Sequence, residues 1–140
     1  MTVYADTSFL LSLYVQDTHS ASALELMRSN PRIWFSPLHF AECFHAIAQQ
    51  IFYRKISESD AQDIYHQIRN DLTAGVWVES AIPDNAFTLC ADLARRYGPK
   101  LGVRTLDSLH VACALELKAE KFWTFDERQA KLAKGEGLKT

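Results

Sequence analysis

The chain has 140 residues, of which 48% are hydrophobic and 23% are charged, and its formal net charge is −2. These values fit one globular domain, placed at residues 1–140, and exclude a disordered or fibrous protein. No apolar run reaches the roughly 18 residues of a membrane span, and the N-terminus lacks a basic signal-peptide start, so no membrane association is expected. The scattered Cys43, Cys90 and Cys113 indicate reduced thiols in a cytoplasmic protein, not disulfides or a zinc site.

Short apolar runs alternate with longer amphipathic segments along the chain. Val3 to Ala5 has the composition of a buried parallel strand, and a helix-length apolar stretch begins at Phe9. Asn30-Pro31 and Gly98-Pro99 are expected to stop helices. In chain order, the pattern after Phe9 predicts helix 18–29, strand 33–35, helix 37–53, helix 57–74, strand 76–78, helix 83–97, helix 105–119, strand 121–125 and helix 126–133, with 137–140 as the stub of a further strand. This alternation predicts an α/β layer structure with a mainly parallel sheet.

Three aspartates stand at predicted strand ends or helix starts. Asp6 follows the first strand, Asp126 follows the strand that ends in Trp123-Thr124-Phe125, and Asp107 lies in the first turn of the most apolar helix. Ligands of open α/β sheets bind outside the carboxyl ends of strands, so these acids are candidate site residues. The alternative is that each aspartate only caps its helix or complements the helix dipole.

Four motifs recur in one known family. They are Tyr4-Ala5-Asp6-Thr7-Ser8, Ala41-Glu42-Cys43, Thr105-Leu106-Asp107-Ser108-Leu109-His110-Val111-Ala112 and Thr124-Phe125-Asp126. With these motifs the chain resembles PIN-domain nucleases, and more narrowly the VapC-like ribonuclease toxins of type II toxin–antitoxin systems. The resemblance covers essentially the whole chain. It implies a three-layer α/β/α sandwich around a mainly parallel sheet of four to five strands.

The resemblance also implies an acidic quartet of Asp6, Glu42, Asp107 and Asp126. Ser8 and Thr124 match the hydroxyl positions near that pocket. Glu42 lies off the apolar stripe of its helix, so a solvated glutamate is the alternative for it. His110, on the same face as Asp107, is either an orienting residue or an ordinary hydrogen-bonded histidine.

Hard oxygen ligands of this kind select Mg²⁺ or Mn²⁺. Such a cation would activate water for in-line attack on a phosphodiester and neutralise charge on the phosphate oxygens. We assign Asp6 and Asp107 as the expected direct ligands, with Glu42 and Asp126 acting through water or on a second ion. Ser8 and Thr124 would position phosphate or a ligand. The expected activity is therefore that of a metal-dependent endoribonuclease.

Two other functions compete with this one. A phosphorylated receiver-like domain would need a second acid beside Asp6 and a strand-end lysine, and the motifs supply neither. A PIN-like fold used only as a non-catalytic binding or assembly module stays open, although four acids in place argue against a degenerate site.

The expected partners are an RNA substrate, a small antitoxin protein and a second copy of the chain. Residues 85–140 carry 10 Lys/Arg and 7 Asp/Glu, whereas residues 1–84 carry 5 and 10, so a basic RNA surface is expected in the second half. Surplus apolar side chains predict a homodimer and a groove for a partner helix. They are Phe9, Leu13, Trp34, Phe44, Ile51, Phe52, Tyr53, Ile56 and Tyr65.

Overall fold

Four parallel strands form the centre of the computed structural model, which describes residues 1–140. In chain order the elements are β1 (Thr2–Ala5), α1 (Thr7–Leu11), α2 (Ser20–Met27), β2 (Arg32–Phe35), α3 (Pro37–Phe52), α4 (Glu58–Thr73), β3 (Trp77–Glu79), α5 (Ala86–Leu101), α6 (Thr105–Glu116), β4 (Lys121–Trp123) and α7 (Glu127–Gly135). All three strand pairings are parallel, in the order β3-β2-β1-β4. The expected α/β fold with a parallel sheet is confirmed, with four strands.

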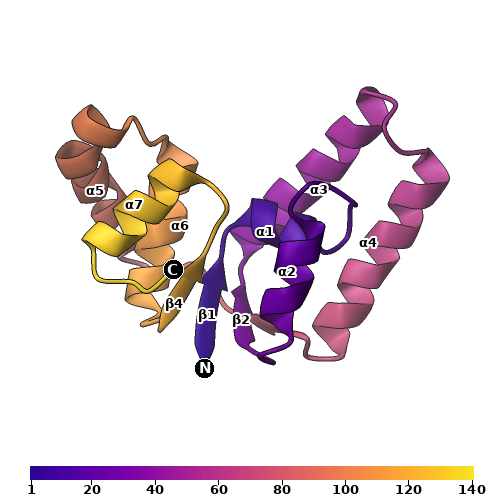
Figure 1. The fold of residues 1–140 in the computed structure, drawn as a ribbon, viewed down its shortest axis with the longest axis horizontal. Coiled ribbons are helices and arrows are strands. Elements are labelled where there is room, and N and C mark those ends of the chain that lie inside the picture. The colour runs from indigo at the N-terminus through magenta and orange to yellow at the C-terminus, as the bar shows by residue number, and fades with distance from the viewer.

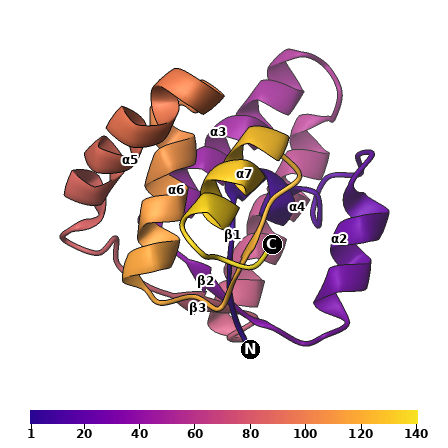
Figure 2. The same ribbon diagram turned by 60° about the vertical axis from the view of Figure 1, so that its left-hand side comes forward.

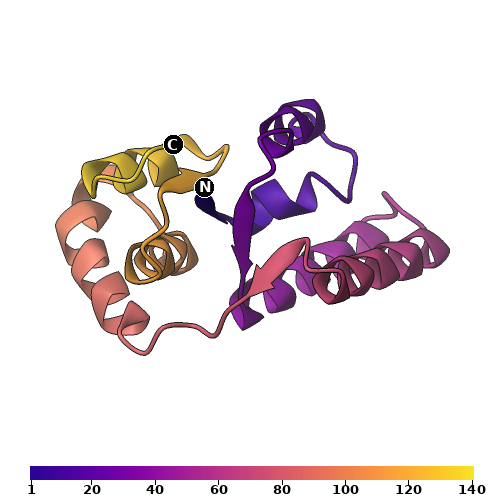
Figure 3. The same ribbon diagram turned by 90° about the horizontal axis from the view of Figure 1, so that it is seen from below.

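Helices cover both faces of the sheet. Helices α1 to α4 lie on one side and α5 to α7 on the other, as Figures 1 and 3 show. Side chains alternate along β1, so Val3 and Ala5 join the core under α1 to α4, and Tyr4 joins the core under α5 to α7. Figure 2 shows α7 lying over the sheet beside α6. None of the helices is long and apolar enough to cross a membrane.

The order of the strands creates a switch point between β1 and β4. The chain adds β2 and β3 on one side of β1, then crosses the other face and adds β4 on the opposite side. Ala5 pairs with Trp123, and the amide of Asp6 donates to the carbonyl of Trp123 at 3.1 Å. The carboxyl ends of β1 and β4 therefore meet where open sheets form their binding crevices.

The first expected helix and the last expected strand are short. Helix α1 has five residues, and at its C-cap the Ser12 hydroxyl donates to the carbonyl of Phe9 at 2.6 Å. At the other end, 137–140 contributes a single bridge, Lys121 to Lys139, and no fifth strand forms. Most other helix and strand ends differ from prediction by a few residues, as is usual for fraying termini.

The predicted stop at Gly98-Pro99 is wrong. Helix α5 continues through Pro99 to Leu101 and ends at Gly102, whose φ is +64°. A residue before proline is normally driven out of the helical region by contacts that involve its Cβ, and Gly98 has none. Pro99 also lies in the last turn, where one missing amide costs a single hydrogen bond.

We expect Gly102→Ala to lower the free energy of unfolding by about 1–2 kcal/mol, because an L-residue at positive φ is strained. Gly102 holds the helix C-cap, with its amide donating to the carbonyl of Gly98 at 2.8 Å. Gly102→Asn is the matched control, since asparagine tolerates this conformation better and should recover part of the loss. Urea unfolding measures both variants. Equal stability of Gly102→Ala and the wild type would contradict the prediction.

Candidate functional site

Asp6 begins the site at the end of β1. Its Oδ1 accepts the amide hydrogen of Phe9 at 2.9 Å, so Asp6 caps α1 as the alternative interpretation proposed. The residue is only 6% exposed, and burial raises the pKa of its carboxyl to about 6. The Phe9 amide acts in the opposite direction and does not cancel the effect of burial. Asp6 is therefore both a cap and a carboxylate held in an unfavourable environment.

Three segments converge around a hollow of about 380 Å³ beside Asp6. They are the start of α1, one flank of α3 and the start of α6. The lining residues are Asp6, Thr7, Ser8, Glu42, Arg104, Thr105, Leu106, Asp107 and His110. We call this hollow the acidic pocket. Four of the six predicted site residues, Asp6, Ser8, Glu42 and Asp107, lie in it together.

Glu42 faces the acidic pocket and not bulk solvent. Its side chain is 25% exposed, and Oε1 accepts hydrogen bonds from the Thr7 hydroxyl at 2.8 Å and from Nε2 of His110. Burial pushes the pKa of Glu42 upward, but the hydrogen bond and charge of His110 and the Thr7 hydroxyl outweigh it, so the net pKa is lowered. The alternative of a solvated glutamate is wrong.

His110 links the pocket to the core of the protein. It is 3% exposed, and its Nδ1 lies 2.8 Å from the hydroxyl of Tyr4. An ionised carboxylate only accepts hydrogen bonds, so Nε2 carries a hydrogen and donates it to Glu42. The interpretation as a hydrogen-bonded histidine is confirmed, and these bonds fix the direction of Glu42.

A second buried histidine holds the strand end that carries Asp6. Nδ1 of His39 accepts the amide hydrogen of Ser36 at 3.0 Å, and Nε2 lies 2.8 Å from the carbonyl of Ala5. Nε2 therefore carries the hydrogen and donates it to Ala5. Burial lowers the pKa of His39 to about 3, which keeps the ring neutral. The start of α3 is thus tied to the end of β1.

Asp107 is less enclosed than the apolar sequence of its helix predicted. Its side chain is 26% exposed, and Oδ2 accepts the amide hydrogen of Arg104 at 3.2 Å and lies 3.6 Å from Nε of Arg104. The Arg104 side chain is 87% exposed, so this ion pair is weak. Asp107 therefore caps α6 and also presents a carboxylate to the pocket.

Asp126 and Thr124 lie outside the lining of the acidic pocket. Asp126 is exposed, and its Oδ1 accepts the amide hydrogen of Gln129 at 2.8 Å, which caps α7. Thr124 lies closer to the pocket, because its Oγ1 is 3.3 Å from Oδ2 of Asp6. The Thr124 hydroxyl also donates to Oε1 of Gln129 at 2.7 Å. The structure thus brings Thr124 to the acids and leaves Asp126 at the edge.

Two residues at the site, Thr7 and Gln129, had no predicted role there, whereas Arg104 belongs to the basic second half that was expected to contact RNA. Thr7 bonds Glu42, Arg104 lines the pocket, and Gln129 bonds both Thr124 and the carbonyl of Asp107. Thr7 lies between two predicted site residues, and this position in the sequence could have identified it. Gln129 gave only a capping signal three residues after Asp126. The side chains that they meet come from distant segments, and local sequence does not encode those contacts.

The donor set of the acidic pocket fits a hard cation. Asp6, Glu42, Asp107 and Ser8 offer only oxygen, the ligand type that Mg²⁺ and Mn²⁺ prefer. No three His, Cys, Asp or Glu side chains converge at metal-ligating geometry. Mg²⁺ keeps several waters and needs only one or two direct carboxylates, so a closed cluster of three is not required. The raised pKa of Asp6 marks the charge that a cation would compensate.

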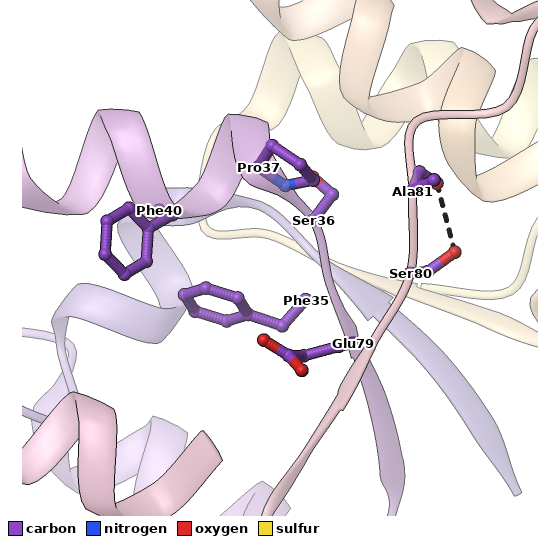
Figure 4. A pocket seen from close by; sticks show the side chains of 7 residues that line it. All are labelled: Phe35, Ser36, Pro37, Phe40, Glu79, Ser80 and Ala81. Atoms are coloured by element: carbon purple, nitrogen blue, oxygen red, sulfur yellow. Dashed lines mark hydrogen bonds between the residues drawn. The ribbon is translucent and has the colours of Figure 1, made fainter. Parts of the chain in front are cut away.

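A second hollow, of about 440 Å³, lies at the carboxyl ends of β2 and β3 (Figure 4). Phe35 and Phe40 form its apolar side, and the carboxylate of Glu79 lies near them. The Ser80 hydroxyl donates to the carbonyl of Ala81 at 3.0 Å. With one carboxylate, this hollow is less suited to a cation site than the acidic pocket.

Comparisons with known proteins agree with this fold. A family model described as PIN domain matches residues 3–135. No curated protein matches the sequence significantly. Three solved structures share the fold. VapC20 of Mycobacterium tuberculosis, described as a Sarcin-Ricin loop cleaving toxin, has a TM-score of 0.69 at 17% identity, over 97% of this chain and 95% of that chain.

The other two structures resemble this chain to a comparable degree. VapBC2 from Rickettsia felis, bound to a DNA fragment from its promoter, has a TM-score of 0.64 at 15% identity, over 94% of this chain and 93% of that chain. FitAcB from Neisseria gonorrhoeae has a TM-score of 0.69 at 13% identity, over 94% and 93%. At these identities the likeness establishes a shared fold.

The pKa of Asp6 predicts how pH changes the stability of the protein in EDTA. The pKa is about 6 in the folded protein, against 3.8 for an ordinary aspartate in the unfolded chain, so its stabilising contribution is complete below 3.8 and is lost as pH rises through 6. Asp6→Asn keeps a capping oxygen and lacks this charge. We therefore expect Asp6→Asn to be more stable than the wild type at pH 7, by on the order of 3 kcal/mol, with the difference shrinking toward pH 4.

Urea unfolding of both proteins between pH 4 and pH 8 measures this difference. His39, with its lowered pKa, contributes in the opposite direction, but it does so in both proteins and cancels. A difference that is independent of pH would show that Asp6 acts only as a cap.

Proposed function

Because the chain belongs to the PIN domain family, we propose that it is a metal-dependent endoribonuclease whose active site is the acidic pocket. The observation that carries this proposal is the convergence of Asp6, Glu42 and Asp107 on one hollow at the switch point of the sheet. Helix capping alone does not explain why three carboxylates from β1, α3 and α6 lie at one place, because like charges repel.

We assign Asp6 and Asp107 as direct ligands of Mg²⁺ or Mn²⁺. Glu42 and Asp126 would act through water or on a second ion, with Asp126 outside the lining of the pocket. The cation, when bound, lowers the pKa of water and neutralises charge that develops on phosphate oxygens. Ser8, at the rim, and Thr124, beside Asp6, position the phosphate.

The chain's own residues prepare this site in three ways. His110 and Thr7 hold Glu42 in one direction through their hydrogen bonds to Oε1. His39 holds the end of β1 and hence the backbone of Asp6. Arg104, with its exposed side chain on the lining, is placed to contact the RNA backbone.

Two other basic residues of the second half, Arg95 and Arg96, are held in ion pairs with acids of the same surface. Arg96 pairs with Glu136 at 2.7 Å and with Asp92 at 2.9 Å, and Arg95 pairs with Asp92 at 3.1 Å. We therefore place the RNA path on the side of Arg104.

We propose further that the protein is the cytoplasmic toxin of a toxin–antitoxin pair, held by a small antitoxin and forming a homodimer. Its fold is shared with VapC20, and VapBC2 and FitAcB support an antitoxin partner. Large apolar side chains on the surface also support protein partners. Leu24 is 59%, Phe52 78%, Tyr53 65% and Phe87 61% exposed.

We expect the purified protein to cleave RNA with Mg²⁺ or Mn²⁺ and to be inactive in EDTA. The products should carry 5′-phosphates, because water and not the RNA 2′-hydroxyl attacks. Asp6→Asn and Asp107→Asn should each lower the cleavage rate at least about 100-fold, within the range found when one charge-stabilising group of an active site is removed.

Asp63→Asn is the matched control, since Asp63 is an exposed acid on α4. Its rate should equal that of the wild type. Cleavage in EDTA or 2′,3′-cyclic phosphate ends would overturn the mechanism. If the wild type binds RNA and cleaves none in either metal, the non-catalytic binding module is the correct function.

Light scattering at micromolar concentration should show twice the mass of one chain, and Phe52→Ser with Tyr53→Ser should shift the protein toward the monomer if these exposed rings lie in the dimer. Purification from the native source should bring a small protein along. A monomeric wild type would contradict the dimer, and purification without a partner would contradict the toxin assignment.

A further inference from the structure

We propose that Gln129 is a positioning residue of the acidic pocket, which sets the spacing between the segments that carry Asp6 and Asp107. The inference rests on the proposed function, because it concerns cation binding in that pocket. Gln129 lies on α7, outside the lining of the pocket, and none of the four motifs includes it.

The side chain of Gln129 bridges two parts of the site. It is 1% exposed, and both of its polar atoms have partners. Nε2 donates to the backbone carbonyl of Asp107 at 3.2 Å, and Oε1 accepts from the Thr124 hydroxyl at 2.7 Å. Because the Asp107 carbonyl only accepts, the NH₂ group must face α6, and the oxygen must face Thr124.

Thr124 extends this bridge to Asp6. Its Oγ1 lies 3.3 Å from Oδ2 of Asp6, so a chain of polar contacts runs from the first turn of α6 to the end of β1. No other side chain makes hydrogen bonds to both Asp107 and Thr124. The bridge is neutral, so it holds the two carboxylate segments together without adding charge to the pocket.

The position of Asp126 supports the same arrangement. Its Oδ1 accepts the amide hydrogen of Gln129 at 2.8 Å, and its own amide donates to Oγ1 of Thr124 at 3.0 Å. Asp126 therefore caps the start of α7, the helix from which the Gln129 side chain reaches α6. Gln129 and Thr124 thus both make hydrogen bonds with Asp126, although its carboxylate stays outside the pocket lining.

Cation binding makes the spacing of these segments matter. Carboxylates that share a pocket repel each other, and repulsion favours a wider separation of β1 and α6 when the pocket is empty of counter-charge. Mg²⁺ demands near-ideal octahedral geometry, so a looser pair of ligands binds it less well. Outer partners that orient metal ligands typically change affinity 10- to 100-fold when they are removed. An apolar residue would fill the buried position of Gln129 without providing this bridge.

The test uses the purified full-length chain, with Mn²⁺ affinity from calorimetry and the melting temperature in EDTA as separate readouts. Gln129→Met keeps the size of the side chain and removes both hydrogen bonds. We expect it to raise the Kd for Mn²⁺ about 10- to 100-fold. Leu132→Val is the matched control, because Leu132 is buried on the same helix and packs only in the core. It should lower the melting temperature and leave the Kd unchanged.

A double-variant cycle tests whether the bridge acts through Thr124. Replacing Gln129 by Met in a Thr124→Val background should change the Kd less than twofold, because the bridge is already broken there. Thr124→Ser keeps the hydroxyl, so in that background Gln129→Met should again raise the Kd for Mn²⁺ about 10- to 100-fold. If Gln129→Met does not fold, Gln129→Asn, which keeps the amide and is too short to reach both partners, takes its place in the cycle.

The outcomes separate this inference from the proposed function. A wild type that binds Mn²⁺ beside a Gln129→Met variant with the same Kd overturns the inference alone. Equal effects of Gln129→Met and Leu132→Val on Kd also overturn it, since the role would then be structural. A wild type that binds no Mn²⁺ overturns the proposed function, and the inference falls with it.

Discussion

Burial of the Asp6 carboxylate at the end of β1 is the constraint to which the surrounding structure responds. A charged group that is 6% exposed is destabilising unless other groups compensate it, and the raised pKa of Asp6 shows that compensation is incomplete. The Phe9 amide donates a hydrogen bond to Asp6, the Thr124 hydroxyl lies 3.3 Å from its Oδ2, and no Lys or Arg makes an ion pair with it. The fold thus holds an acid where a bound cation would stabilise it most.

The same constraint explains why histidines, and not arginines, support the site. His39 is neutral and holds the backbone before Asp6, while His110 gives one hydrogen bond to Glu42 and reaches Tyr4 in the core. A buried arginine in either place would neutralise the acids and compete with a cation. The side chains that support the site therefore hold its acids in place without neutralising them, so the acids still need a counter-charge.

The elements were predictable because their signals are local. The alternation of short apolar runs with longer amphipathic segments indicated most helices and the four strands. The end of the helix at Gly98-Pro99 was misplaced because the lack of a Cβ on Gly98 outweighs the usual effect of proline. The placement of Asp6 at a strand end also followed from sequence. The side-chain partners of Glu42 and Thr124 did not, because helix direction fixes only which face a residue occupies, and tertiary contacts decide what that face meets.

The acidic pocket is assembled from segments that lie far apart in the sequence, since Thr7 contacts His110 across 103 positions. Contacts of this kind form late in folding, because the entropic cost of closing a long loop precedes the stabilisation that the contacts provide. During synthesis, β1, α1 and α3 leave the ribosome long before α6, the segment that carries Asp107 and His110, and domains form from such segments only once all are available. A nascent chain therefore carries Asp6 and Glu42 without the rest of the pocket, and any activity of the pocket begins only when most of the polypeptide has been made.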